Sequence, residues 1–216
     1  GLTRPTAHRL LGALAAEGFL DRDPVRGGWL LGPELYVLGA VAAERYDIAG
    51  IAAEHLREIA RETGESAFLS ARRGDETVCL LREEGSFPLR SFVLYEGIRF
   101  PLGVASAGIA ILAMLPDEER EGYLARTDLV PAWGPQHAPD ALRARLRRTR
   151  EEGWAVNPGL IVEGSWGMAA AVLDPAGRPA WALSITGVES RFRPERRREL
   201  GRLLLDHAHA ISRALA

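Results

Sequence analysis

The sequence predicts an α+β protein in which helices flank a curved antiparallel sheet. Two pairs of apolar runs read as strands joined by turns, one turn at Gly74-Asp75 and the other at Asp174–Gly177. Amphipathic helical repeats stand at the two ends of this region, over residues 48–63 and 194–215. A linker helix and a short segment that reads as a helix followed by a hairpin precede it in the chain.

Length and composition limit the possible classes of protein. The 216 residues, 47% of them hydrophobic, can bury a large core and fit one large domain with a smaller piece. We expect the pieces to be residues 1–32, 33–46 and 47–216. The formal net charge of −2 does not favour a nucleic-acid partner, because proteins that bind nucleic acid usually carry a basic surface.

The single cysteine and the hydropathy indicate a compartment. Cys79 cannot form an internal disulfide, so a reducing environment is expected. No apolar run is long enough to span a bilayer, and we expect no membrane partner. The sequence therefore predicts a cytoplasmic protein.

No spacing in the sequence is typical of a metal or cofactor site. Cysteine pairs and His-x-x-His clusters are absent, and His207 and His209 stand two apart, which directs them to different sides of a helix. His137 lies in a proline-containing stretch over residues 128–139 and is expected to be solvated. We expect neither metal nor cofactor.

The N-terminal segment reads as a helix followed by a hairpin. Thr3 can cap the helix, Pro5 fits its first turn and Gly18 ends it. One apolar stripe is expected to be buried, formed by Ala7, Leu10, Leu11 and Leu14. Residues 18–22 and 28–31 read as two short strands, with Arg26 at the tip of the loop between them.

The other face of this helix is suited to DNA. It carries hydroxyls and cations and no acidic side chain before Glu17, so it can approach base edges and phosphates without repulsion. The simpler alternative, a helix and hairpin that merely pack together, is about equally compatible with the residues alone. The candidate DNA-contacting residues are Thr3, Arg4, Pro5, Thr6, His8, Arg9 and Arg26.

The string Gly1–Leu11, followed by Glu17–Leu20 and Leu30–Gly32, resembles the recognition helix and wing of IclR-family transcriptional regulators. The resemblance implies that the residues around Arg4-Pro5-Thr6 enter the major groove of double-stranded operator DNA and that Arg26 approaches the flanking backbone. It also implies that two helices of a winged helix-turn-helix precede Gly1, so residues 1–32 are expected to be the C-terminal part of such a domain. The helix over residues 33–46 corresponds to the family's linker helix, which helps to pair subunits.

A stretch of small residues, 103–108, leads into an apolar helix. Small residues let the backbone approach a ligand, and free N–H groups at a helix start favour a carboxylate. Tight packing of helix on sheet is the commoner reason for such a stretch, and both reasons can hold. Ser184 and Thr186 alternate with apolar residues in a predicted strand, so their hydroxyls share one face of the sheet.

This part of the chain is similar to the ligand domain of IclR-family regulators, a GAF-like fold. It keeps Pro101, Leu102 and Gly108, but Gly103 and Ile109 stand where the family usually has His and Lys. The resemblance implies an effector pocket, in which Asn157 replaces a commonly acidic residue and Gly167 makes room. We expect a carboxylate larger than pyruvate, with aromatic acids as candidates. The pocket residues are Phe92 and Phe100 as apolar walls, with Ser106, Ala107, Asn157, Gly167, Ser184 and Thr186.

These features predict a ligand-responsive, DNA-binding transcriptional regulator that forms a homodimer or homotetramer. An enzyme is not expected, because the stretch nearest to a nucleophile elbow, Glu163–Gly167, lacks the glycine two positions before its serine. The alternative is a stand-alone small-molecule sensor or interaction module that does not bind DNA.

Residues 90–95 are expected to form the third strand of the sheet.

Overall fold

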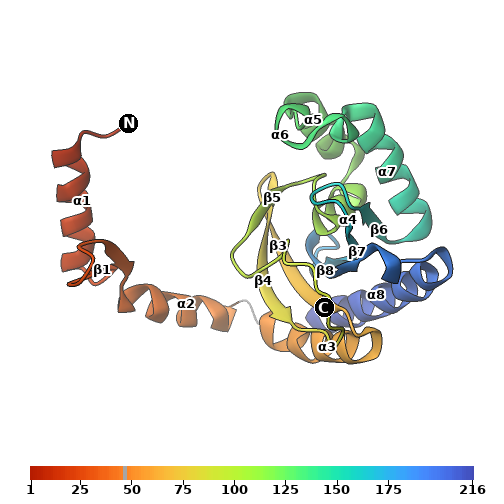
Figure 1. Ribbon diagram of the computed structural model, residues 1–216, viewed down its shortest axis with the longest axis horizontal. Coiled ribbons are helices and arrows are strands. Elements are labelled where there is room, and N and C mark those ends of the chain that lie inside the picture. Colours follow the sequence, from red (N-terminus) through yellow and green to blue (C-terminus); the bar gives the residue numbers. More distant parts are fainter. Residues whose placement is uncertain (46–47) are drawn as a thin grey trace. The chain divides into compact units, whose positions relative to one another are not determined.

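The computed structural model describes residues 1–45 and 48–216 and divides them into two compact units, Gly1–Asp47 and Ile48–Ala216 (Figure 1). Tyr46 and Asp47, where we expected the linker helix to end and the large domain to begin, lie outside the described residues.

The first unit is a helix, a hairpin and a second helix. Helix α1 spans Arg4–Ala16, strands β1 (Leu20–Arg22) and β2 (Trp29–Leu31) pair antiparallel, and helix α2 spans Pro33–Arg45. Gly18 has a φ of 75°, and a Cβ on Gly32 would lie 2.1 Å from the Gly18 carbonyl oxygen. Only glycine therefore fits where the two ends of the hairpin cross.

The apolar stripe of α1 is not buried as expected. Leu10 and Leu14 are 51% and 44% exposed, because no described residue of this unit covers that side of the helix. The apolar residues of α2 are also exposed: Leu35, Tyr36, Val37, Leu38 and Val41.

The second unit is built on a six-stranded antiparallel sheet of order β5-β4-β3-β8-β7-β6. Both predicted hairpins form and supply the four central strands. Gly74 has a φ of 62° in the turn of one hairpin. In the turn of the other, the Asp174 carboxylate accepts hydrogen bonds from the N–H groups of Ala176 and Arg178. The strands are β3 (Ser66–Arg73), β4 (Glu76–Glu83), β5 (Arg99–Pro101), β6 (Ala155–Pro158), β7 (Ser165–Leu173) and β8 (Pro179–Val188).

The third strand was predicted in the wrong place. Residues 90–95 form a loop, and the edge of β4 pairs instead with β5, where Val78 faces Arg99 and Thr77 faces Phe100. The N–H of Gly97 also donates to the Cys79 carbonyl at 2.8 Å. Residues 97–101 therefore occupy this edge of the sheet, and residues 90–95 do not pair with it. The short strand β6 was not predicted, because four residues before a glycine turn carry too little alternation to be recognised.

Alternate residues of the sheet face two different helical layers. Phe68, Ala169 and Ala182 face helix α4 (Ser106–Met114), whereas Leu69, Met168 and Leu183 face α3 (Ile48–Thr63) and α8 (Pro194–Leu215). Helices α3 and α8 lie side by side (Figure 1). Helix α4 is apolar all round and buried, which suits the centre of a layer. The remaining helical elements are α5 (Asp117–Arg126), α6 (Val130–Trp133), α7 (Pro139–Glu152), η1 (Pro135–His137) and η2 (Glu189–Arg191).

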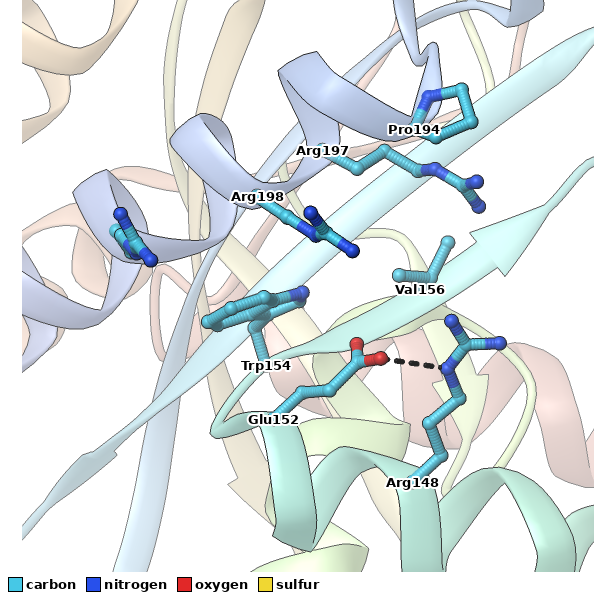
Figure 2. A pocket seen from close by; sticks show the side chains of 8 residues that line it. Arg148, Glu152, Trp154, Val156, Pro194, Arg197 and Arg198 are labelled. Carbon is cyan, nitrogen blue, oxygen red and sulfur yellow. Dashed lines mark hydrogen bonds and ion pairs between the residues drawn. The ribbon is translucent and has the colours of Figure 1, made fainter.

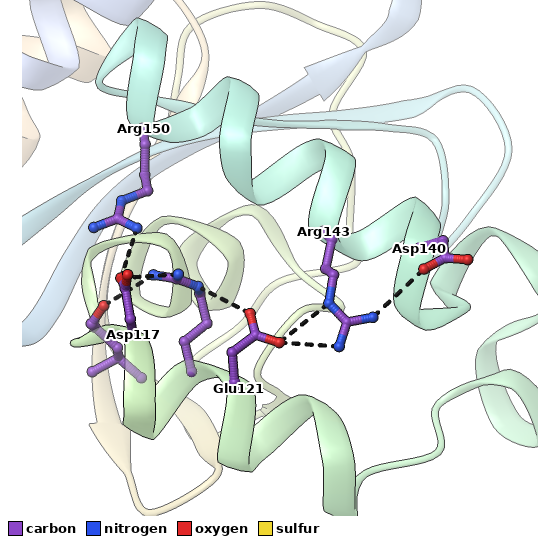
Figure 3. A network of polar contacts seen from close by, with 7 residues as sticks. Asp117, Glu121, Asp140, Arg143 and Arg150 are labelled. Atoms are coloured by element: carbon purple, nitrogen blue, oxygen red, sulfur yellow. Dashed lines mark hydrogen bonds and ion pairs between the residues drawn. The ribbon is translucent and has the colours of Figure 1, made fainter.

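Ion pairs on the surface join α5 to α7 (Figure 3). Arg150 contacts Asp117 at 3.0 Å, and Arg143 contacts Glu121 at 3.0 Å. Most of these side chains are well exposed, so each pair stabilises the fold by about 1 kcal/mol at most.

His137 is not solvated as expected but is 2% exposed. Its Nδ1 lies 2.8 Å from the carbonyl oxygen of Trp133, and its ring packs beside the Trp133 ring. Burial, and then the charge of Arg145, lower the pKa of His137. The short helical turn η1 thus directs a loop histidine inward.

A buried carboxylate connects the two ends of the second unit in sequence. Glu65, immediately before β3, has a side chain only 1% exposed. Its Oε1 accepts hydrogen bonds from Arg191 Nε at 2.7 Å and from Arg196 Nη1 at 2.9 Å. Arg191 of η2 and Arg196 of α8 therefore reach inward to pair with this carboxylate.

Candidate functional site

A small cleft lies between the first turn of α4 and strands β6, β7 and β8. Four of the predicted effector residues, Ser106, Asn157, Gly167 and Thr186, come together in its lining, whereas the predicted Ala107 and Ser184 are not among the lining residues. They arrive from four elements that are separated in sequence but adjacent in the sheet and its covering helix. The remaining lining residues are Val93, Leu94, Ala105, Ile161, Ser165 and Trp166.

The first turn of α4 is buried without a cap. Ala105 precedes the helix and offers no side-chain hydrogen bond, and Ser106 and Ala107 are 3% and 1% exposed. The backbone N–H groups of Ser106, Ala107 and Gly108 have no hydrogen-bond partner among the described residues. Free donors at the positive end of a helix dipole favour an anion at this position.

The hydroxyls of Ser184 and Thr186 face the same side of the sheet as α4. Neither hydroxyl oxygen has a hydrogen-bond partner within the described part of the chain, although both are buried. A buried polar group without a partner costs about 1–3 kcal/mol. Thr186 stands opposite Gly167 in the β7–β8 register, and Ser184 stands opposite Ala169 two residue pairs further along.

Asn157 and Gly167 shape the cleft. Asn157 Nδ2 donates to the Val104 carbonyl at 2.7 Å, and its Oδ1 accepts from the Leu160 N–H at 2.9 Å. Asn157 thus fixes the loop before α4. A Cβ on Gly167 would lie 3.1 Å from Ser106 Oγ, so glycine at this position leaves room beside the helix start.

The two predicted aromatic walls do not line this cleft. Phe92 is 80% exposed, because its segment is a loop and not the strand that would have directed it inward. Phe100 is buried in β5 but packs edge-to-face against Trp133, with ring centroids 5.6 Å apart. Val93, Leu94 and Ile161 supply the apolar wall instead, and the sequence pattern gave no sign of them.

The cleft holds only about 20 Å³, roughly the space of one water molecule. A wider hollow of about 560 Å³ adjoins it and shares Val93 and Ser165 with it, and the predicted Phe92 lines this hollow. Ser91 Oγ and Ser165 Oγ lie 2.5 Å apart where the two spaces meet. The loop around Ser91 therefore limits how much of the cleft is open.

A separate basic pocket of about 310 Å³ lies between α7 and α8 (Figure 2). Arg148 pairs with Glu152 at 2.8 Å along α7, and Arg198 of α8 lies over Trp154. The guanidinium of Arg197 lies over the Trp166 ring, 5.3 Å from its centroid. None of the predicted effector residues lies there. Its lining is Arg148, Glu152, Trp154, Val156, Pro194, Arg197, Arg198 and Arg202.

The candidate DNA face of α1 is largely exposed. Arg4, Pro5 and Arg9 reach solvent, whereas Thr6 is half-buried and its hydroxyl lies 2.9 Å from that of Thr3. Thr3 begins the helix, but its side chain does not cap a backbone N–H as we expected.

Two of the predicted DNA-contacting residues also hold the hairpin. The His8 ring packs edge-to-face against Trp29, and Arg22 Nη1 lies 3.4 Å from His8 Nε2. At the hairpin tip, the Asp23 carboxylate accepts the N–H groups of Arg26 and Val25, and these bonds lower the pKa of Asp23. Arg26 is exposed beyond this turn.

Family models match both units. Residues 40–213 match the model of the bacterial transcriptional regulator IclR C-terminal domain, and residues 1–24 match the IclR helix-turn-helix domain. The chain belongs to the IclR family. The predicted resemblance and the predicted α+β fold are thereby confirmed, and an enzyme is excluded because the related proteins are transcriptional regulators.

Curated relatives and solved structures agree with this family. The chain is 30% identical to the HTH-type transcriptional regulator KipR of Bacillus subtilis over 216 residues, which cover 100% of the chain and 86% of KipR. It is 32% identical over 212 residues to the HTH-type transcriptional repressor AllR of Salmonella typhi, covering 97% of the chain and 77% of AllR.

Among solved structures, the Thermotoga maritima IclR is similar, with a TM-score of 0.80, 29% identity, and coverage of 99% of this chain and 86% of that one. An IclR homolog from Microbacterium hydrocarbonoxydans, solved in complex with 4-hydroxybenzoate, has a TM-score of 0.83, 25% identity and coverage of 99% and 86%. No helix within the described ranges 1–45 and 48–216 is long and apolar enough to cross a membrane.

Proposed function

We infer that this IclR-family transcriptional regulator binds a small carboxylate in the cleft at the start of α4 and that this binding modulates its contact with operator DNA. One observation carries the effector assignment. The uncapped, buried first turn of α4 meets the unpartnered hydroxyl of Thr186 across a cleft that also contains Gly167. The unpartnered hydroxyl of Ser184 lies on the same face of β8, beyond the residues that line the cleft.

The donors favour a carboxylate over a neutral ligand. One carboxylate oxygen would accept hydrogen bonds from the N–H groups of Ser106 and Ala107. The other would accept hydrogen bonds from the hydroxyls of Thr186 and Ser184. Such charge-assisted bonds are roughly twice as strong as neutral ones. The residues that line the cleft include neither Arg nor Lys, so the helix dipole and neutral donors would balance the charge there, and Arg90 is a lining residue of the adjoining hollow.

The body of the ligand would extend toward Val93, Leu94 and Ile161. These apolar side chains suit an aliphatic or aromatic acid, and the 4-hydroxybenzoate bound by the Microbacterium homolog supports the aromatic class. An acid of that size exceeds the present space of about 20 Å³. Binding would therefore displace the loop at Ser91 and join the cleft to the wider hollow of about 560 Å³.

In the first unit, we assign DNA contact to the exposed face of α1 and to the hairpin tip. Arg4, Arg9 and Arg26 supply cations for phosphates or base edges, and Thr3, Pro5 and Thr6 form the helix start that enters the groove. His8 would add a contact at the edge of the same surface while holding Trp29. The match to the family's helix-turn-helix model over residues 1–24 favours this role over the stand-alone sensor.

A homo-oligomer is part of this proposal. Helix α2 exposes Tyr36, Leu38 and Val41 by 81%, 50% and 55%, and a second copy of the chain would bury this apolar surface. An effector that binds one arrangement of the subunits more tightly would shift the spacing of two recognition helices over a two-fold operator.

The decisive experiment combines a binding assay with a gel shift. Calorimetry of the chain with benzoate, 4-hydroxybenzoate and pyruvate, and with benzamide as an uncharged control, should yield heat for an aromatic acid and none for the amide. A gel shift against the DNA beside its own gene should then show a band that the same acid weakens or sharpens. Binding of benzamide and benzoate with equal affinity would refute the carboxylate site, and a band that no acid alters would refute the regulatory coupling.

A further inference from the structure

Two histidines that lie near opposite ends of the second unit's sequence are in contact at its surface. His55 on α3 and His207 on α8 are 152 positions apart, yet their Nδ1 atoms lie 2.7 Å from each other. The rings are nearly perpendicular, with an interplanar angle of 78° and centroids 5.0 Å apart. Both Nδ1 atoms thus converge on one point between the two helices, and at this separation one donates a hydrogen bond and the other accepts it.

A carboxylate completes the cluster. Glu58 follows His55 by one helical turn, so the two side chains share a face of α3. Glu58 Oε2 lies 3.9 Å from His207 Nδ1, and the three ligand atoms all lie within 4.8 Å of one another. Within the described part of the chain, the ion pair of Glu58 is with His207 and not with an arginine.

These separations are close to those that a tetrahedral metal ion requires. Zn²⁺ bonds of about 2.0–2.2 Å place neighbouring ligand atoms roughly 3.3–3.6 Å apart. The observed 2.7 Å and 3.9 Å lie on either side of that range, and no separation exceeds 4.8 Å, so side-chain movements of about 1 Å would bring the three ligand atoms into it. Glu58 is 46% exposed, which leaves the fourth position open to water.

The ligand set also selects the metal class. Two imidazoles and one carboxylate suit Zn²⁺, Co²⁺ or Ni²⁺, whereas Mg²⁺ and Ca²⁺ prefer oxygen ligands alone. We propose that His55, Glu58 and His207 form a site for a divalent transition metal such as Zn²⁺, which fastens α3 to α8. The expectation of no metal site rested on spacing within the sequence, and spacing cannot reveal a pair formed across 152 positions.

The test uses the full chain stripped of metal by a chelator. Titration with Zn²⁺ in a calorimeter should show about one equivalent bound per chain, and Co²⁺ should give the visible absorption bands of a four-coordinate ion. Replacing His207 with Ala should weaken Zn²⁺ at least about 100-fold, since even outer-sphere changes cost roughly 10–100-fold. At a Zn²⁺ concentration of about 100 times Kd, the Tm should rise by roughly 5–10 °C in the wild type.

His209→Ala is the matched control, because His209 is exposed on the same helix two positions from His207. This variant should bind Zn²⁺ like the wild type, and Mg²⁺ should release no heat with any variant. His55→Gln and His207→Gln provide ligand removal with milder packing changes if an alanine variant fails to fold. The proposal is overturned if the wild type binds no Zn²⁺, or if the double variant His55→Gln/His207→Gln binds it with unchanged affinity.

Discussion

Asn157 donates a hydrogen bond from Nδ2 to the carbonyl oxygen of Val104 at 2.7 Å, while its Oδ1 receives the N–H of Leu160 at 2.9 Å. The resemblance suggested Asn157 as an effector contact. Both halves of its amide are engaged in holding the loop that leads into α4, so its role in this conformation is to position the loop. The effector would then meet an already ordered helix start.

Replacing Asn157 with Asp should destabilise the second unit. A carboxylate cannot donate to Val104, and it would place a negative charge, 4% exposed, beside a carbonyl oxygen. We expect a loss of about 3 kcal/mol in the free energy of unfolding, measured by urea denaturation. Asn157→Ala removes the hydrogen bonds without adding charge and should cost less. Equal stability of the Asp variant and the wild type would show that the Val104 contact contributes nothing.

Removing the two unpartnered hydroxyls should lower the affinity for the effector without lowering the stability of the free protein. Ser184→Ala with Thr186→Val keeps the shape of the strand but deletes two buried groups that have no partner in the described structure. The Tm of the free protein should stay the same or rise, and affinity for an aromatic acid should fall by about 10–100-fold, which is roughly 1.4 kcal/mol per tenfold step.

Thr77→Val is the control for this pair. Thr77 is a buried threonine of β4 in the same sheet, its hydroxyl reaches the Phe100 carbonyl at 3.4 Å, and it does not line the cleft. Calorimetry should find its acid affinity unchanged. Full acid affinity in the double variant would remove Ser184 and Thr186 from the proposed site.

Arg9→Ala should reduce both the affinity for DNA and its dependence on salt. One lost phosphate contact lowers the slope of log K against log salt by about 0.9. Fluorescence anisotropy at several salt concentrations measures that slope. Arg57→Ala, which removes an exposed arginine of α3 paired with Glu54 at 2.7 Å, should leave it unchanged. A slope that is the same in wild type and Arg9→Ala would exclude a phosphate contact.

The buried carboxylate of Glu65 should contribute far more stability than the exposed ion pairs. Glu65→Ala leaves Arg191 and Arg196 without their shared partner and should lower the free energy of unfolding by about 3 kcal/mol. Glu54→Ala, which breaks an exposed pair with Arg57, should cost less than about 1 kcal/mol. Chemical denaturation of both variants tests the difference, and similar losses would contradict it.

Acidification should destabilise the fold through His137. Its pKa is lowered in the folded state, so the folded protein disfavours the protonated form that the unfolded chain accepts below about pH 6.5. The stability is therefore full above the unfolded pKa and is lost as pH falls from there through the lower folded pKa. His137→Gln should flatten the decline in stability between about pH 7 and pH 5. An unchanged decline would assign the acid sensitivity to other groups.

The sequence alone determined the local architecture. The turns at Gly74 and at Asp174–Gly177, the amphipathic helix at residues 194–215 and the alternation of Ser184 and Thr186 with apolar neighbours each follow from the periodicity or turn chemistry of a few adjacent residues. Family resemblance identified the kind of protein from short strings near Arg4 and Gly108. These signals depend on residues adjacent in the sequence, so they hold whichever tertiary contacts form around them.

Tertiary structure decided which distant residues meet. Whether Phe92 lined a cleft depended on which segment paired with β4, and that edge went to residues 97–101. His137 turned inward because Trp133 offered a carbonyl, and His55 met His207 because α3 packs on α8. Burial and contact are properties of the packed layers, and one residue's neighbours in sequence carry little information about its neighbours across a sheet.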